Sequence, residues 1–139
     1  MADFERRFCV APMMNWTDRH CRSFMRLISS EAVLYTEMIT TGAILHGDTH
    51  YHLDLSSNES PVALQLGGSN PHELSKCVKL IENYPYNEIN LNCGCPSDRV
   101  QNGMFGAVMM KNANLTADCI SALLDTSELP ITVKHRIGV

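Results

Sequence analysis

The sequence lacks any run of about 18 apolar residues, the length that a membrane-spanning helix needs. Its opening stretch, Met1 to Arg7, is too charged for a signal peptide, and no apolar segment follows it. Stretches of low complexity, which would indicate disorder, are also missing. These absences disfavour membrane and secreted proteins, and we expect a folded, cytoplasmic protein without a membrane partner.

Charge of one sign is not in large excess, since the formal net charge is −4. A weakly acidic chain has no broad affinity for nucleic acids or acidic membranes, although a local basic patch or a further segment could still bind RNA. Hydrophobic residues make up 45% of the 139 residues and charged residues 19%, which provides enough apolar material for the core of one modest domain.

Six cysteines are present, and without a secretion signal they are expected to be reduced thiols rather than disulfides. Four of them sit in apolar contexts, where a cysteine usually serves as a small core residue: Cys9, Cys21, Cys77 and Cys119. The other two, Cys93 and Cys95, belong to a C-x-C motif.

Short β-rich segments alternate with amphipathic segments along the chain. Strands are predicted over 8–11, 32–38, 61–66, 88–92 and 131–135. Helices are predicted after Thr17 and Asp18, after the start signal Asn70-Pro71-His72-Glu73, and over 116–124. Their predicted buried faces are Leu74, Cys77, Val78 and Ile81 in one helix and Ile120, Leu123 and Leu124 in another. The longer, polar stretch 40–58 is expected to be an irregular loop.

This β-α-β-α order predicts a parallel sheet covered by helices, in either an open doubly wound sheet or a TIM (β/α)8 barrel. Polar residues follow the C-terminal ends of several strands, where a barrel places its active site. No G-x-G-x-x-G turn follows the first strand, which disfavours the doubly wound alternative. Because a barrel needs about 250 residues, residues 1–139 are expected to be the N-terminal part of a longer catalytic barrel, with about the first five β/α units.

The sharpest motif is Asn90-Leu91-Asn92-Cys93-Gly94-Cys95-Pro96-Ser97, a strand that breaks into a tight turn. It places Cys95 on a loop just beyond the edge of the sheet. A free thiol has a pKa of about 8.5, so it is mostly protonated at neutral pH and can act as an acid as well as a nucleophile. A zinc site would need a second pair of ligands, which is absent. From the residues alone, a catalytic thiol and a structural thiol both stay open.

Four more polar side chains are candidates for the same site. Asn90 and Asn92 alternate toward one side of their strand, and an amide suits the edge of a heterocyclic base, or else satisfies loop backbone groups. Lys134 ends the last strand, where it either meets an anion at a barrel mouth or is simply solvated. Gln65 lies between leucines in an apolar strand, so its amide needs a partner, which could be a ligand ring.

A metal site is not expected. His46, His50 and His52 lie in a polar stretch with acidic neighbours, but their spacing matches no strong metal-binding motif.

The motifs coincide with those of a known family. In order along the chain, they are Ala11-Pro12-Met13-Met14-Asn15-Trp16-Thr17-Asp18, Asn90-Leu91-Asn92-Cys93-Gly94-Cys95-Pro96 with Gly103-Met104-Phe105-Gly106-Ala107, and Thr132-Val133-Lys134-His135-Arg136. Together they resemble the tRNA-dihydrouridine synthase family over essentially the whole chain. The segments Met14-Asn15-Trp16 and Ser97-Asp98-Arg99-Val100-Gln101 are most similar to its bacterial A-type members. The family differs in having a complete barrel and a C-terminal helical domain that binds tRNA.

The resemblance implies an FMN cofactor at the barrel mouth that NADPH reduces. It implies hydride transfer to C6 of a uridine in the tRNA D-loop and protonation of C5 by a cysteine. Carried over by position, Cys95 is the proton donor and Asn92 faces the uracil. The positions implied to bind the flavin are Pro12, Met13, Met14, Gln65 and Lys134. The complete protein is expected to be a monomer.

Two alternatives stay open beside this interpretation. One is another flavin barrel, of the dihydroorotate or dihydropyrimidine dehydrogenase type, acting on free pyrimidines. The other is a non-catalytic fragment with structural thiols. If the protein is a flavin enzyme of either kind, the 139 residues alone are expected to bind the flavin poorly and to be inactive. The reason is that barrel phosphate sites commonly follow strands seven and eight.

Overall fold

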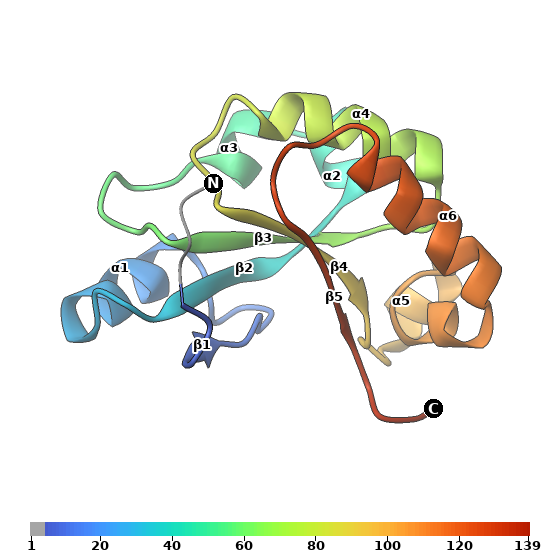
Figure 1. Ribbon diagram of the computed structural model, residues 1–139, viewed down its shortest axis with the longest axis horizontal. Coiled ribbons are helices and arrows are strands. Elements are labelled where there is room, and N and C mark those ends of the chain that lie inside the picture. Colours follow the sequence, from blue (N-terminus) through green and yellow to red (C-terminus); the bar gives the residue numbers. More distant parts are fainter. Residues whose placement is uncertain (1–4) are drawn as a thin grey trace.

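The structure, a computed structural model, describes residues 5–139 as five strands with helices between them (Figure 1). The strands are β1 (Cys9–Val10), β2 (Val33–Thr40), β3 (Val62–Gly67), β4 (Glu88–Cys93) and β5 (Ile131–His135). The helices are α1 (Arg19–Ile28), α2 (Thr41–His46), α3 (Thr49–Leu53), α4 (Pro71–Ile81), α5 (Asp98–Asn102), the 3-10 helix η1 (Gly106–Lys111) and α6 (Ala113–Leu124). No helix in this described part is long and apolar enough to cross a membrane.

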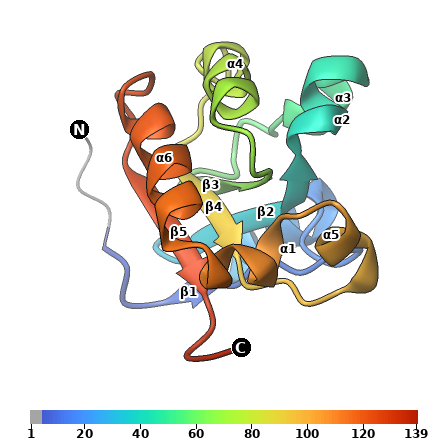
Figure 2. The same cartoon turned by 90° about the vertical axis from the view of Figure 1, so that its right-hand side faces the viewer.

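The five strands form one parallel sheet in the order β1-β2-β3-β4-β5. A doubly wound sheet would reverse its strand order at a switch point, and this sheet does not. The strands instead follow one another in chain order, as in the first half of a barrel, and the twisted sheet curves with them (Figures 1 and 2). The chain is therefore a half-barrel that matches the first units of a TIM barrel, which confirms the predicted fold class.

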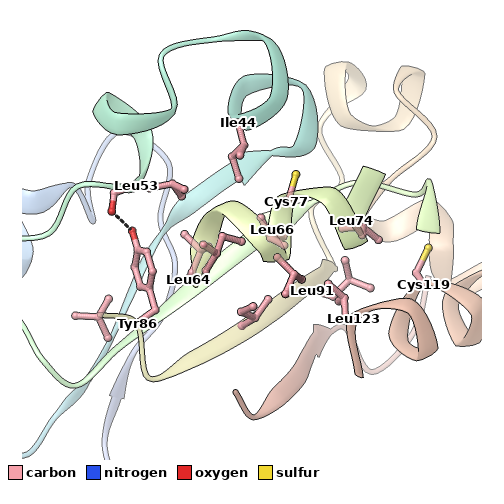
Figure 3. Close-up of a cluster of buried hydrophobic side chains, with 14 of the residues drawn as sticks. Ile44, Leu53, Leu64, Leu66, Leu74, Cys77, Tyr86, Leu91, Cys119 and Leu123 are labelled. Carbon is pink, nitrogen blue, oxygen red and sulfur yellow. Dashed lines mark hydrogen bonds between the residues drawn. The ribbon is translucent and has the colours of Figure 1, made fainter. Parts of the chain in front are cut away.

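The two faces of the sheet differ in chemistry, because side chains alternate along a strand. Leu64, Leu66 and Leu91 point to the outer face and are fully buried. They pack there against the predicted stripe of α4, all four members of which are buried, and against Leu123 of α6 (Figure 3). The inner face carries polar side chains instead: Gln65, Glu88, Asn90 and Asn92, each at most 8% exposed.

The predicted helix starts at Asp18 and Asn70 are confirmed. The Asp18 carboxylate accepts the backbone N–H of Cys21 at 2.8 Å, and the Asn70 amide oxygen accepts those of His72 and Glu73 at 3.0 and 3.3 Å. Such caps satisfy N–H groups that have no partner within the helix.

Three predictions about packing are wrong. Leu124 is 57% exposed, because Cys119 and Leu123, four residues apart, form the buried edge of α6. Cys9 is exposed, since β1 is a two-residue edge strand that little covers, and Cys21 is only half-buried, because α1 turns Arg22 rather than Cys21 to the interior. Cys77 and Cys119 are buried as predicted.

The stretch 40–58 is not an irregular loop, since α2 and α3 lie within it. Both are capped, by the Thr40 hydroxyl on the Ala43 N–H at 3.2 Å and by the Asp48 carboxylate on the Tyr51 N–H at 3.0 Å. Each helix anchors one fully buried side chain, Ile44 or Leu53. Helices of six and five residues are too short to produce the periodic pattern on which the sequence prediction relied.

Helix α1 buries a charge. Arg22 is its one buried residue, and its Nε donates to the fully buried Glu59 carboxylate at 2.6 Å. The Arg22 Nη1 also donates to the Thr17 carbonyl at 2.8 Å, and the second Glu59 oxygen accepts the Ser56 N–H at 2.8 Å. The pair therefore ties α1 to the segment that leads into β3.

Candidate active site

A cavity of about 230 Å³ opens at the C-terminal ends of the strands. It is lined by Pro12, Met14, Met38, Gln65, Asn92, Gly94, Cys95, Pro96, Lys134 and Arg136. Six of the seven site residues named from the sequence thus lie together. The seventh, Met13, is not in the lining, and its backbone carbonyl accepts the N–H groups of Trp16 and Thr17.

The loop that carries Cys95 is held on several sides. The Asn92 amide oxygen accepts the backbone N–H groups of Gly94 and Cys95 at 3.1 and 3.0 Å. The Cys95 carbonyl accepts the N–H of Ala107 at 2.9 Å, and Arg136 donates to the Gly94 carbonyl at 2.6 Å. Among the described residues, the half-buried Cys95 thiol has one hydrogen-bond partner, Ser97 Oγ at 3.6 Å from Sγ. A fixed backbone therefore presents an accessible thiol to the cavity.

The two cysteines of the C-x-C motif have different surroundings. Cys93 points to the outer face and is 2% exposed, and burial raises the pKa of its thiol to about 11. Both cysteines are free, so the pair is not a disulfide. Across the described residues, no three His, Cys, Asp or Glu side chains gather closely enough to hold a metal ion. Cys95 is therefore the thiol of this motif that is placed for chemistry in the cavity.

Three amides on the inner face are joined to one another. Asn92 Nδ2 donates to Gln65 Oε1 at 2.8 Å, and Gln65 Nε2 donates to Asn90 Oδ1 at 2.7 Å. Asn90 and Asn92 do share one side of β4, as predicted. Asn92 satisfies backbone groups of the cysteine loop, which is one of the two alternatives left open by the sequence, and it also lines the cavity.

Lys134 is exposed at the end of β5, and it forms no hydrogen bond or ion pair with the residues that the structure describes. A cation at the cavity rim without a protein partner is available to a negatively charged ligand. Arg136, whose role the sequence leaves undecided, instead supports the cysteine loop.

Sequence reasoning missed Met38 as a site residue. The pairing of β2 with β3 shifts between Tyr35 and Met38, and this irregularity brings Met38 into the cavity lining. A second cavity of about 390 Å³ adjoins the first, and both are lined by Met14, Met38 and Cys95. The only sequence signal for Met38 is its place near a strand end, which many side chains share.

Gly106 shapes the cysteine loop, and its substitution gives a first test. Its φ of 71° lies in the left-handed region, and a Cβ there would lie 2.6 Å from the Cys95 carbonyl oxygen and also meet Val100. We expect Gly106→Ala to lower the free energy of unfolding by about 1–3 kcal/mol. The matched control is Gly42→Ala in α2, where a Cβ meets nothing within 4 Å. Helix propensity predicts a gain there of about 0.5–1 kcal/mol. Urea unfolding of both variants measures these changes, and equal effects would contradict our account of the loop.

The cavity combines apolar and polar groups in a way that suits a flat ring with a polar edge. Pro12, Met14 and Met38 offer apolar contact surface, while Gln65, Asn92 and Lys134 offer hydrogen-bond donors. Among the residues that the structure describes, neither an acidic side chain nor a cluster of metal ligands lines this cavity. The residues present therefore fit an isoalloxazine ring, the group that the sequence resemblance implies.

Comparison with known proteins agrees with this geometry. The family model described as dihydrouridine synthase (Dus) matches residues 9–139. Proteins named tRNA-dihydrouridine(20/20a) synthase are similar to the chain: that of Salmonella typhi is 62% identical over 133 residues, that of Escherichia coli K12 63% over 133, and that of Pseudomonas putida 59% over 134. Each match covers 96% of this chain but only 38–40% of the relative. The chain thus spans about two fifths of the length of these relatives.

Proposed function

The chain belongs to the dihydrouridine synthase family, and we propose on that premise that the complete protein reduces the C5–C6 double bond of D-loop uridines in tRNA to dihydrouridine. FMN is the proposed cofactor and NADPH the proposed reductant. The names of the relatives specify positions 20 and 20a, which makes these the uridines to test first.

One observation carries the proposal: a thiol on a well-held loop lines a cavity whose other walls suit a flavin ring. Cys95 lines that cavity together with Lys134, Gln65 and Asn92. These four side chains come from β3, from β4 with the loop that follows it, and from β5, so the sheet itself sets their spacing. A structural thiol would need no such cavity beside it.

Residues of three elements would hold the cofactor. We assign the ring contacts to Pro12 and Met14 of the loop after β1, to Gln65 of β3 and to Lys134 of β5, while Met13, which does not line the cavity, would hold that loop through its backbone carbonyl. The Lys134 ammonium group would stabilise the negative charge of the reduced ring. We assign the FMN phosphate site, the remaining barrel strands and the tRNA-binding domain to the part of the relatives that this chain does not span.

Cys95 would complete the reaction as a general acid. Bound reduced flavin supplies a hydride to C6 of the uracil ring, which leaves negative charge on C5 and on the adjoining C4 carbonyl. The Cys95 thiol donates its proton to C5, and solvent returns a proton to the sulfur. In total, one hydride from NADPH and one proton from water are added to the ring. The uridine has to leave the tRNA stack to reach the cavity.

The proposal is tested with the complete protein. We expect it to be purified with a yellow flavin chromophore, which NADPH bleaches. When tRNA from a strain lacking the modification is added, dihydrouridine should form, as detected by nucleoside mass spectrometry. Free uracil serves as the control substrate. Equal reduction of free uracil would favour a dehydrogenase acting on free pyrimidines, and a colourless protein would favour the non-catalytic alternative.

A further inference from the structure

The larger of the two adjoining cavities, of about 390 Å³, is not used by the cofactor and uracil contacts assigned above. We propose that this neighbour cavity, whose lining includes Met38, Ala43 and Phe105, binds the base of a nucleotide next to the reactive uridine in the same tRNA strand. The catalytic cavity then takes one base and the neighbour cavity the adjoining one. The inference rests on the proposed function, since it extends the binding of that substrate from one nucleotide to two.

The two cavities share a wall, since Met14, Met38 and Cys95 line both of them. A uridine whose C5 lies against the Cys95 thiol is therefore bound at the boundary of the neighbour cavity. A nucleic-acid strand carries a base on every nucleotide, so a second base reaches this boundary whenever the reactive uridine is in place. The neighbour cavity is thus continuous with the site that the tRNA has to enter.

The walls of the neighbour cavity suit the flat face of a base. Half of the lining side chains are apolar: Met14, Met38, Ile39, Ala43, Val100 and Phe105. Tyr51 adds an aromatic ring that is 76% exposed. Bases of any sequence stack on such side chains, because every base has a π-face. The volume of about 390 Å³ also lies within the range of about 300–1,000 Å³ that is usual for pockets that bind small ligands.

Several polar side chains of the lining already bind groups of the protein. One Glu37 carboxylate oxygen accepts a backbone N–H of the loop after β1, and the Thr40 hydroxyl accepts a backbone N–H of α2. The Ser97 hydroxyl is the partner of the Cys95 thiol. A pocket with few uncommitted polar groups discriminates little between bases. This suits a protein whose relatives are named for two successive positions, 20 and 20a, because the neighbouring nucleotide then differs from one reaction to the other.

The neighbour cavity is not a seam that the rest of the barrel closes. Its walls come mainly from β2, α2, α3 and the loop and helix that follow β4. Further barrel strands would join the sheet at its two edge strands, β1 and β5. Among the described residues, no member of the lining belongs to β5 or follows it. Most of the cavity is therefore complete within the half-barrel.

The first variant fills the neighbour cavity and leaves the catalytic one open. Ala43→Leu adds an apolar side chain at a residue that lines the neighbour cavity and not the catalytic one. Gly42→Leu is the matched control, because it adds the same side chain one residue earlier in α2. Gly42 lines neither cavity, and a Cβ there meets nothing within 4 Å. Both variants are made in the complete, flavin-loaded protein.

The measurement is tRNA binding without NADPH. The tRNA has a single uridine at the reactive position, and the base is removed from the nucleotide on one side of it or on the other. We expect one of these two removals to weaken binding by about tenfold in the unsubstituted protein and in Gly42→Leu, the usual effect of losing one stacked base. In Ala43→Leu the same removal should change binding by less than about twofold, because the leucine already occupies the place of the base. Comparing variants on the same pair of tRNAs cancels any effect of the missing base on the tRNA itself.

A second pair of variants tests the aromatic wall without adding volume. Tyr51→Ala removes a ring that is 76% exposed, so the fold should tolerate the change. Phe24→Ala is its control, because Phe24 is also exposed, at 60%, and lies on α1 outside both cavities. We expect the removal of the neighbouring base to weaken binding by at most about threefold in Tyr51→Ala and by about tenfold in Phe24→Ala.

The outcomes separate the neighbour cavity from the proposed function. Equal effects of base removal in all four variants, on both sides of the uridine, would overturn the inference. A lower flavin content in Ala43→Leu than in Gly42→Leu would also overturn it, since the cavity would then hold part of the flavin. The proposed function is decided separately, by whether dihydrouridine forms. A protein that binds the tRNA but reduces no uridine would refute the proposed function, while the binding comparison would still decide whether the cavity holds a base.

Discussion

Replacing Cys95 by alanine in the complete protein is expected to lower dihydrouridine formation by about 10²–10⁴-fold, the usual contribution of a general acid. Flavin reduction by NADPH should be unchanged, because in our proposal the thiol acts only after the hydride has moved. Stopped-flow absorbance measures the flavin step, and nucleoside mass spectrometry measures the product. The expected result is therefore a flavin that is reduced normally but reoxidised slowly by tRNA.

The fold should survive this change, since the loop is held by backbone bonds and by Asn92 rather than by the sulfur. Cys21→Ala is the control, because it removes a half-buried thiol on α1 that does not line the cavity. Cys95→Ser tests the acid directly, since a serine hydroxyl is a far weaker acid in the same place. Product formation by Cys95→Ala at the rate of the Cys21→Ala control would show that another group protonates C5.

Arg22→Met is expected to lower the free energy of unfolding by about 3–5 kcal/mol, the usual cost of removing one partner of a buried ion pair. The reason is the Glu59 carboxylate, which is fully buried and, among the described residues, would keep only the Ser56 N–H as a hydrogen-bond donor once Arg22 is gone. Urea unfolding of the complete protein, followed by circular dichroism, measures the change.

Two further variants isolate the buried charge as the cause. Arg19→Met makes the same substitution three residues earlier in α1, where the arginine is exposed and lies 3.9 Å from Asp54. An exposed pair of this kind contributes at most about 1 kcal/mol. Adding Glu59→Met to Arg22→Met should restore part of the stability, because no unpaired charge then remains. If Arg22→Met costs no more than Arg19→Met, the buried pair does not hold α1 in place.

The sequence was sufficient for features that depend on local patterns. The parallel strands follow from apolar runs between helix signals, and the caps at Asp18 and Asn70 follow from residues that are adjacent in the chain. Cys95 could be placed at the cavity because Gly94 and Pro96 must end β4. Period-two alternation put Asn90 and Asn92 on one side of that strand.

Features that depend on distant partners could not be predicted. Glu88 opens β4, where a charged residue usually faces water, and it is buried only because Arg6 and Tyr35 reach it from 82 and 53 positions away. The side-chain hydrogen bonds that join Asn92, Gln65, Asn90 and Thr132 likewise require the register of three strands. Met38 enters the cavity through an irregularity in strand pairing that has no sequence signature.

The strand order has a consequence for how the chain is made. Every strand pairs with the one synthesised just before it, and none is inserted between earlier strands. The strands therefore leave the ribosome in the same order in which they lie in the sheet, and each strand pairs with the edge of the strand synthesised before it. When β5 emerges, Thr132 and Lys134 arrive beside Asn90 and Asn92 through strand register alone. The side chains assigned to chemistry thus all come from one contiguous stretch of polypeptide, in which neighbouring strands in the sheet are also neighbours in the chain.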